Sequence, residues 1–359
     1  MNKHRKQRGA RARLDPRGTI LGAVALLSVS ACRQPERPPG EVVYESDRVR
    51  LYAEASVSYC GGTADYLERH LDQVESRYGL SPPQIVEYYL LGDLDDWCEQ
   101  VPDSTACGGS GLVYATAAPS THELSHAIRA TPSRAVVTEG WAELMDNGMP
   151  PYSASEAIPD AVRVDGPDLP FELYASAGAF MQYVELDFGA DAVRRLLDET
   201  DGEMTFAEFE TVFAEITGVA LDMYAAVAQS VPCDSRGASW VLATCSRQDG
   251  LAIAEQPLDW DLDASCSSAD AYGPWRGEYW VEQVLDVDAD GTRVDIAIDL
   301  PAEATTTLER CASCEDFVGH EFGENELTNR TLQAGRWYLR VRAPLGTPLA
   351  GRIEVRVSP

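Results

Sequence analysis

Three residues in one short segment have the types and the spacing that suit chemistry at a metal ion. His122, Glu123 and His126 form the pattern HExxH. Residues four apart on a helix face the same way, so both imidazoles can reach one ion. Glu123 is one position round the helix from His122, where its carboxylate can contact a water on the metal without being a ligand. The pattern predicts a zinc site on a helix that begins near Ser120, with Ser120 or Thr121 as its cap.

A third protein ligand is required, because catalytic zinc usually takes three protein ligands and keeps one open position. Glu139 follows the second histidine by thirteen residues and begins the segment EGWAE. Two helices packed antiparallel bring Glu139 back over the histidines, and Gly140 removes a side chain where the helices approach. Glu143, one turn further on, can accept a hydrogen bond from the distal nitrogen of a ligand histidine. The residues alone leave Glu143 and Asp146 open as alternatives to Glu139 as the third ligand.

The hydrophobic pattern before and after these segments favours helices. Residues 63–78 have apolar positions at helical spacing, and residues 120–230 read as successive helices. Only the runs at 42–59 and 85–91 have the composition of strands. We therefore expect a mainly helical part with a small N-terminal sheet.

The pattern changes in the last third of the chain. Short alternating runs appear at 293–300, 337–341 and 352–357, and glycine-containing turns separate them. Such runs are typical of an antiparallel β-sandwich. The predicted fold class is therefore α+β, with a mainly helical domain over 43–232 and a β-sandwich domain over 233–359.

The N-terminus has the features of an export signal. Its basic start is followed by the apolar run 19–31, which is too short for a permanent membrane span. The run ends in VSA before Cys32 and so resembles a bacterial lipobox, in which the cysteine carries lipid. We expect a lipoprotein signal peptide over 1–31 and a tether over 32–42, with the chain anchored to a membrane of the cell envelope, on its periplasmic face or at the cell surface. The alternative is ordinary signal-peptide cleavage beside a chance cysteine.

The charge balance excludes one class of partner. The chain has 58 Asp and Glu against 29 Lys and Arg, for a net charge of −29. Residues 1–31 carry a net positive charge, so the rest of the chain is even more acidic, and it contains no lysine. A surface this acidic repels phosphate groups, so we expect no binding to nucleic acid.

The cysteine count agrees with export. Eight cysteines remain besides Cys32, and an even number in an exported chain favours disulfides. Short separation favours the pair Cys98–Cys107 and, less strongly, Cys233–Cys245. We interpret these eight cysteines as structural rather than redox-active.

The motifs together resemble the gluzincin metallopeptidases, and more closely their bacterial peptidase MA-like group. That group has an HELxH helix, an EGxAE helix and a tyrosine-containing helix, which match residues 122–126, 139–143 and 174–189 here. The resemblance covers roughly residues 43–230. It implies that His122, His126 and Glu139 bind Zn²⁺, that Glu123 is the general base, and that Glu143 orients a ligand.

The expected function is that of an exported, lipid-anchored zinc metallopeptidase. In this hypothesis a zinc-activated water attacks the peptide bond of a peptide or protein substrate, and Glu123 takes the proton. Tyr174 is the candidate donor to the developing oxyanion, and Tyr152 and Tyr183 are its rivals. The alternative is a catalytically inactive, metallopeptidase-like surface protein whose β domain carries recognition.

Overall fold

The structure is a computed structural model of the 359-residue chain. It describes residues 38–98, 105–129, 132–146, 157–228, 250–253, 257–311, 319–323 and 326–357. The predicted signal peptide, Cys32, Tyr152 and the pair Cys233–Cys245 lie outside these ranges, so those predictions stay untested.

The first sheet lies within the N-terminal part of the chain. Its strands are β1 (Glu41–Glu45), β2 (Val49–Ala53), β3 (Val86–Leu90), β4 (Ala106–Gly109) and β5 (Leu112–Ala115). They are ordered β1-β2-β3-β5-β4; β2, β3 and β5 run parallel, and each outer strand pairs antiparallel with its neighbour. Helix α1 (Thr63–Tyr78) makes the crossover from β2 to β3 and ends at Gly79 in the left-handed conformation.

Helices occupy most of the chain between the first sheet and residue 228. They are α2 (Thr121–Ile128), α3 (Ala135–Leu144), α4 (Ile158–Ala161), α5 (Tyr174–Phe188), α6 (Ala190–Glu199), α7 (Phe206–Thr217) and α8 (Leu221–Ala228), with a 3-10 turn η2 (Phe171–Leu173). One apolar core joins these helices to the sheet and includes Leu67, Leu124, Trp141 and Phe180, all fully or almost fully buried. No single helix of the described ranges has the length and apolarity of a membrane span; α7 and α8 meet that criterion only together, as a pair bent by 79°.

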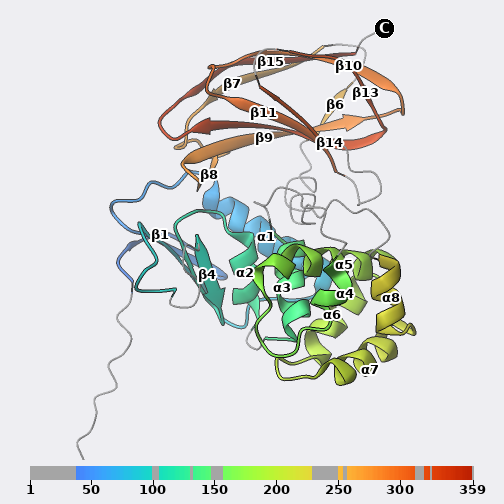
Figure 1. The fold of residues 1–359 in the computed structure, drawn as a ribbon. Helices are drawn as coiled ribbons and strands as arrows, with labels where there is room; N and C mark the ends of the chain where they lie inside the picture. The colour runs from blue at the N-terminus through green and yellow to red at the C-terminus, as the bar shows by residue number, and fades with distance from the viewer. Residues whose placement is uncertain are drawn as a thin grey trace, which may run out of the picture. The chain divides into compact units, whose positions relative to one another are not determined.

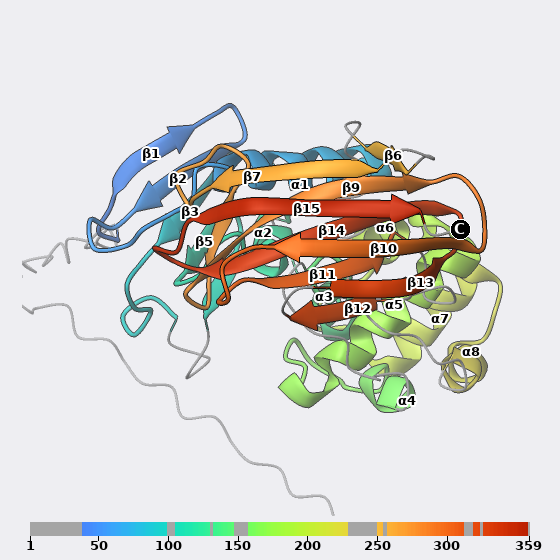
Figure 2. The same ribbon diagram turned by 90° about the horizontal axis from the view of Figure 1, so that it is seen from above.

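The C-terminal part is built of two stacked sheets (Figures 1 and 2). Its strands are β6 (Leu251–Ile253), β7 (Leu258–Ala264), β8 (Tyr272–Trp275), β9 (Glu278–Val287), β10 (Thr292–Asp299), β11 (Thr305–Arg310), β12 (Gly319–Gly323), β13 (Glu326–Leu332), β14 (Gly335–Pro344) and β15 (Leu349–Val357). One sheet has the order β13-β10-β15-β7; the other has the order β12-β11-β14-β9-β6, with β8 added to β9. All pairs are antiparallel except β6 with β9. Alternate residues such as Val281, Leu339 and Ile353 fill the core between the layers.

The predicted fold class is wrong in its balance of helix and strand. About a third of the described chain is helix and about a third is strand, with three sheets and eight α-helices, so the protein is not mainly helical. The hairpin of β4 and β5 was not predicted from the sequence. Its first strand is ACGG, which has almost no apolar alternation, and both strands have only four residues. The first sheet is consequently larger than the small one expected.

The two cores belong to one compact unit, Pro38–Pro359. The predicted boundary at 232 lies in a stretch outside the described ranges, so the two-domain division stays a prediction. Two disulfides are described. Cys98–Cys107 confirms the pair that short separation favoured, and Cys60–Cys266 joins residues 206 positions apart.

Candidate metal centre

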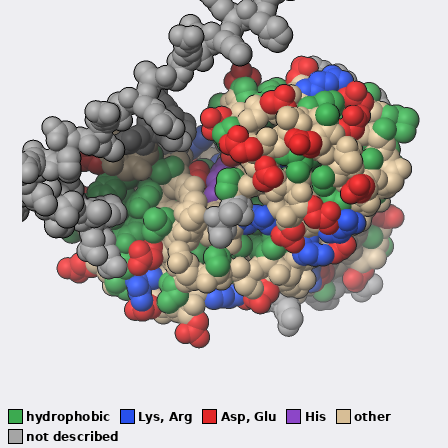
Figure 3. All heavy atoms as spheres, turned by 90° about the horizontal axis from the view of Figure 1, so that it is seen from below, with side chains coloured by type: hydrophobic (Ala, Val, Ile, Leu, Met, Phe, Trp, Pro, Cys, Tyr) green, Lys and Arg blue, Asp and Glu red, His purple; other side chains and the backbone are tan. Residues whose placement is uncertain are grey.

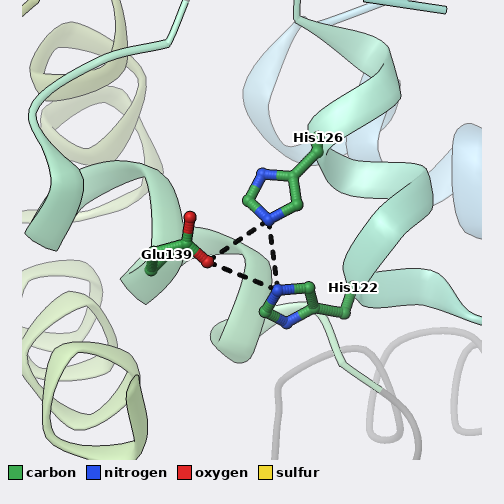
Figure 4. Close-up of side chains that lie close together, drawn as sticks. All are labelled: His122, His126 and Glu139. Carbon is green, nitrogen blue, oxygen red and sulfur yellow. Dashed lines mark hydrogen bonds and ion pairs between the residues drawn. The ribbon is translucent and has the colours of Figure 1, made fainter. Parts of the chain in front are cut away.

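Helix α2 places two histidine side chains side by side. His122 and His126 are one turn apart, and their Nε2 atoms are 3.1 Å from each other (Figure 4). Both side chains are 14% exposed. Because the two histidines are four residues apart on a helix, their imidazole nitrogens point at the same position.

Helix α3 brings a carboxylate to the same position. Oε2 of Glu139 lies 3.5 Å from Nε2 of His122 and 3.3 Å from Nε2 of His126. The three candidate ligand atoms all lie within 4.8 Å of one another. Of the three carboxylates left open by the sequence, Glu139 is the one grouped with both histidines, whereas Asp146 is buried and lies outside this cluster.

Glu143 contacts the other side of one histidine. Its Oε1 is 3.2 Å from Nδ1 of His122. A carboxylate there favours a proton on Nδ1 and leaves Nε2 as the free lone pair that a metal requires. The structure thus places Glu143 where the sequence predicted it, one turn beyond Glu139 on the same face of α3.

Without a metal, the histidines and carboxylates of the site shift one another's pKa values. Burial lowers the pKa of His122, but hydrogen bonds to Glu139 and Glu143 outweigh it, so this pKa stands well above its usual range. Burial raises the pKa of Glu139, and the two histidines more than reverse that effect, so this carboxyl has a pKa below its usual range. Without a metal, a proton on His122 therefore balances the negative charge of Glu139, and a bound cation would take the place of that proton.

Glu123 lies against the first sheet, on the edge of the same site. A side chain added at Gly108 of β4 would come within 3.1 Å of Oε2 of Glu123 and 2.8 Å of its carbonyl oxygen. Gly108 is thus needed where β4 passes α2. The charge of Glu123 also helps to raise the pKa of His122, and Glu123 is not among the residues of the ligand cluster.

Aromatic rings extend the site away from the histidines. The ring of Tyr174 stacks parallel to His122 at 6.0 Å, and Phe171 packs at 5.4 Å from Tyr174. Burial, together with the charge and hydrogen bond of Glu139, raises the pKa of Tyr174 well above its usual range. Its hydroxyl is therefore a proton donor at neutral pH. Tyr183, a rival for this role, is buried on α5 and packs in the core.

Helix α3 is held by a close contact with α5. A Cβ at Gly140 would lie 2.5 Å from the carbonyl oxygen of Ala177, and one at Gly178 would lie 2.8 Å from Cβ of Glu143. Gly140 does lie where two helices approach closely, as predicted. The predicted partner helix was wrong, because the neighbour at Gly140 is α5 and not α2.

Two buried residues that the sequence analysis did not select hold α2. Nε2 of His70 on α1 lies 3.4 Å from Oγ of Ser125, whose hydroxyl donates to the carbonyl of Thr121. The hydroxyl of Tyr88 on β3 accepts from the backbone N–H of Ser120 at 3.0 Å. The predicted cap is not formed, since neither Ser120 nor Thr121 makes a side-chain capping bond. Tyr88 instead holds the residue that precedes the helix, and no local sequence signal indicates this contact.

The donor set fits a zinc ion. Two imidazole nitrogens and one carboxylate oxygen match the ligands of a catalytic zinc site, and the proton on Nδ1 of His122 has its acceptor. The site also reaches solvent, because the side chains of His122 and His126 are each 14% exposed. Figure 3 shows a histidine side chain, in purple, at the surface of one face of the molecule.

Comparisons with known proteins show limited likeness. No protein-family model matches the chain, and no curated protein matches it. Among solved structures, the pre-peptidase C-terminal domain of a collagenase from Bacillus anthracis is 12% identical, with a TM-score of 0.21, over 31% of this chain and 99% of that one. An aminopeptidase A from Legionella pneumophila, in complex with aspartic acid, is 11% identical, with a TM-score of 0.34, over 84% of this chain and 34% of that one. At these scores the likeness carries no argument about function.

Proposed function

We propose that this chain is a zinc-dependent peptidase of the gluzincin type. The observation that carries the proposal is the meeting of His122, His126 and Glu139, from two separate helices, beside a carboxylate that is not part of the cluster. Helix periodicity explains the two histidines, but only the packing of α3 explains why Glu139 joins them. Glu143 supports the same interpretation, because an acceptor at Nδ1 is the usual companion of a ligand histidine.

The residues of the chain have distinct parts in the proposed reaction. A bound zinc supplies Lewis acidity and lowers the pKa of water. Glu123 accepts the proton of the attacking water at its carboxylate and passes it to the leaving amine. Tyr174 donates its hydroxyl proton in a hydrogen bond to the developing oxyanion, and its raised pKa keeps that proton in place.

The proposed substrate is an extended peptide or protein segment. Strand β4 is the outer strand of the first sheet as described, and it lies directly beside Glu123. An extended peptide can pair with such an edge through its backbone. On the other side, the ring of Phe171 is 70% exposed. It packs on Tyr174, whose ring in turn stacks on His122. This arrangement favours an apolar side chain within a few residues of the scissile bond.

The proposed location is the bacterial cell envelope. The sequence features of residues 1–42 support a lipid anchor at Cys32, and the two disulfides fit an oxidising compartment. In this setting the acidic surface of the remaining chain faces solvent.

The function is tested with purified protein freed of metal and then supplied with zinc. Hydrolysis of a mixed peptide pool, followed by mass spectrometry, is expected only after zinc is added, and His122→Ala is expected to abolish it. Stoichiometric zinc binding with no cleavage of any peptide would instead favour the inactive, metallopeptidase-like binding protein.

A further inference from the structure

We propose that residues 266–274 of the C-terminal part are a brace for the metal centre. In this account the sandwich is not a removable appendage: its contacts with α1 and with the segment before α2 set the position of the metal-binding helix. The proposal concerns metal binding, so it rests on the proposed metal site but not on peptide cleavage.

The first contact fixes the start of α1. The disulfide Cys60–Cys266 joins it covalently to the segment after β7. The backbone N–H of Cys60 donates to the carbonyl of Gly273 at 3.0 Å, and that of Gly61 donates to the carbonyl of Cys266 at 2.7 Å. Oγ1 of Thr63 both donates to the carbonyl of Gly273, at 2.6 Å, and accepts from its N–H, at 3.3 Å. Thr63 and Cys60 are fully buried, so these bonds are shielded from water.

This contact is closely fitted. A Cβ at Gly61 would lie 2.6 Å from the carbonyl oxygen of Ser268, and one at Gly62 would lie 2.6 Å from that of Ala269. Two adjacent glycines therefore let the backbones approach to hydrogen-bonding distance. Such a fit holds α1 in one position and leaves little freedom for the two parts to slide.

An aromatic cluster extends the contact along α1. Tyr66 is fully buried against Tyr272 of β8 and Trp280 of β9, with ring centroids 5.1 and 6.2 Å away. The guanidinium of Arg69 lies over the rings of Tyr66 and Tyr272. Burial of these rings adds hydrophobic stabilisation to the hydrogen bonds.

Helix α1 passes this restraint to the metal-binding helix. His70 follows Tyr66 by one turn, is fully buried, and approaches Ser125 through its Nε2 atom. Ser125 lies inside the HExxH segment, directly before His126. A shift of α1 therefore changes the packing behind one of the metal ligands.

The second contact reaches α2 directly. The backbone N–H of Ala118 donates to the carbonyl of Pro274 at 2.6 Å. Ala118 precedes His122 by four residues, in the segment that leads into the helix. Residues 266–274 thus restrain α2 from two sides, at its lead-in segment and through α1.

Thr63→Val tests the brace, because it keeps the shape of the side chain and removes the hydroxyl that pairs with Gly273. Its zinc dissociation constant, measured by competition with a chromophoric chelator, is expected to rise about tenfold or more, the size of effect seen for supporting residues at metal sites. Amide hydrogen exchange in α2 of the metal-free protein is expected to speed up. Thr63→Ser restores the hydroxyl and is expected to restore both values. Thr217→Val, which loses a comparable bond to the carbonyl of Phe213 in α7, is the matched control and is expected to change neither.

Ser125→Ala is the second variant, since alanine is a strong helix former. It removes the contact with His70 and is expected to weaken zinc binding in the same direction. Wild-type zinc affinity and wild-type exchange in α2 for folded Thr63→Val, or wild-type affinity for Ser125→Ala, would overturn the proposal. A wild-type chain that binds no zinc would refute the metal site itself, which is a separate result.

Discussion

The contact between α3 and α5 predicts a large effect from one added methyl group. In Gly140→Ala, the new Cβ would lie 2.5 Å from the carbonyl oxygen of Ala177 and 2.8 Å from Cγ of Met181. An ordinary contact needs at least 3.4 Å, so α3 must move away from α5 by up to roughly 1 Å. Overpacking of this kind costs about 1–3 kcal/mol, and the better helix propensity of alanine offsets about 1 kcal/mol. We expect a net loss in the free energy of unfolding of up to about 2 kcal/mol.

The same movement displaces a metal ligand. Glu139 is the neighbour of Gly140 in α3, and a shift of 1 Å at an active site can cost about a hundredfold in function. We expect zinc to bind at least tenfold more weakly in Gly140→Ala. Urea unfolding of the metal-free protein gives the stability, and competition with a chelator gives the zinc affinity. Gly109→Ala is the control, because a Cβ there meets nothing within 4 Å. Wild-type stability and zinc affinity in Gly140→Ala would refute the claim that this contact positions Glu139.

Three further results are expected. Glu143→Gln removes the charged acceptor at Nδ1 of His122 and should weaken zinc binding about 10–100-fold in a chelator titration; an unchanged affinity would contradict the orienting role. Burial lowers the pKa of His70 from 6.5 to about 3. Below pH 6.5 the unfolded chain therefore binds a proton that the folded chain does not. The free energy of unfolding should fall by up to about 1.4 kcal/mol per pH unit as the pH is lowered. His70→Phe should flatten this slope in urea unfolding at pH 7 and pH 5, and equal slopes would refute it. Phe171→Ala should lower kcat/KM about tenfold for peptides with an aromatic residue near the scissile bond and less for alanine peptides. Met223→Ala, which removes another exposed apolar side chain, should have no such effect.

The local part of the site follows from the sequence because helix geometry has a fixed period. His122 and His126 must share a face at a spacing of four, and Glu139 and Glu143 must share one for the same reason. The structure adds the packing that brings the two faces together. Helix α3 approaches α5 through Gly140 and Gly178, and no pattern along the chain states which helix is the neighbour.

No sequence pattern predicts the contacts between residues far apart in the chain. Eight cysteines allow 105 pairings, and the pair Cys60–Cys266 closes a loop too long for separation to favour it. The carbonyl of Pro274 and the hydroxyl of Tyr88 act on the backbone before α2, which depends on tertiary placement alone. The hairpin of β4 and β5 was missed because both strands have only four residues and β4 (ACGG) has almost no apolar alternation, and this omission made the expected first sheet too small.

Glu123→Gln is the most direct test of zinc-dependent peptide hydrolysis at this site, because it removes the proposed base and leaves the three proposed ligands intact. The measurement is the turnover of a fluorogenic peptide by the zinc-loaded variant and by the zinc-loaded wild type, with zinc content determined on the same samples. We expect about one zinc per chain in both proteins and a loss of turnover of at least a hundredfold in the variant. Full turnover by zinc-loaded Glu123→Gln would show that Glu123 is not the general base.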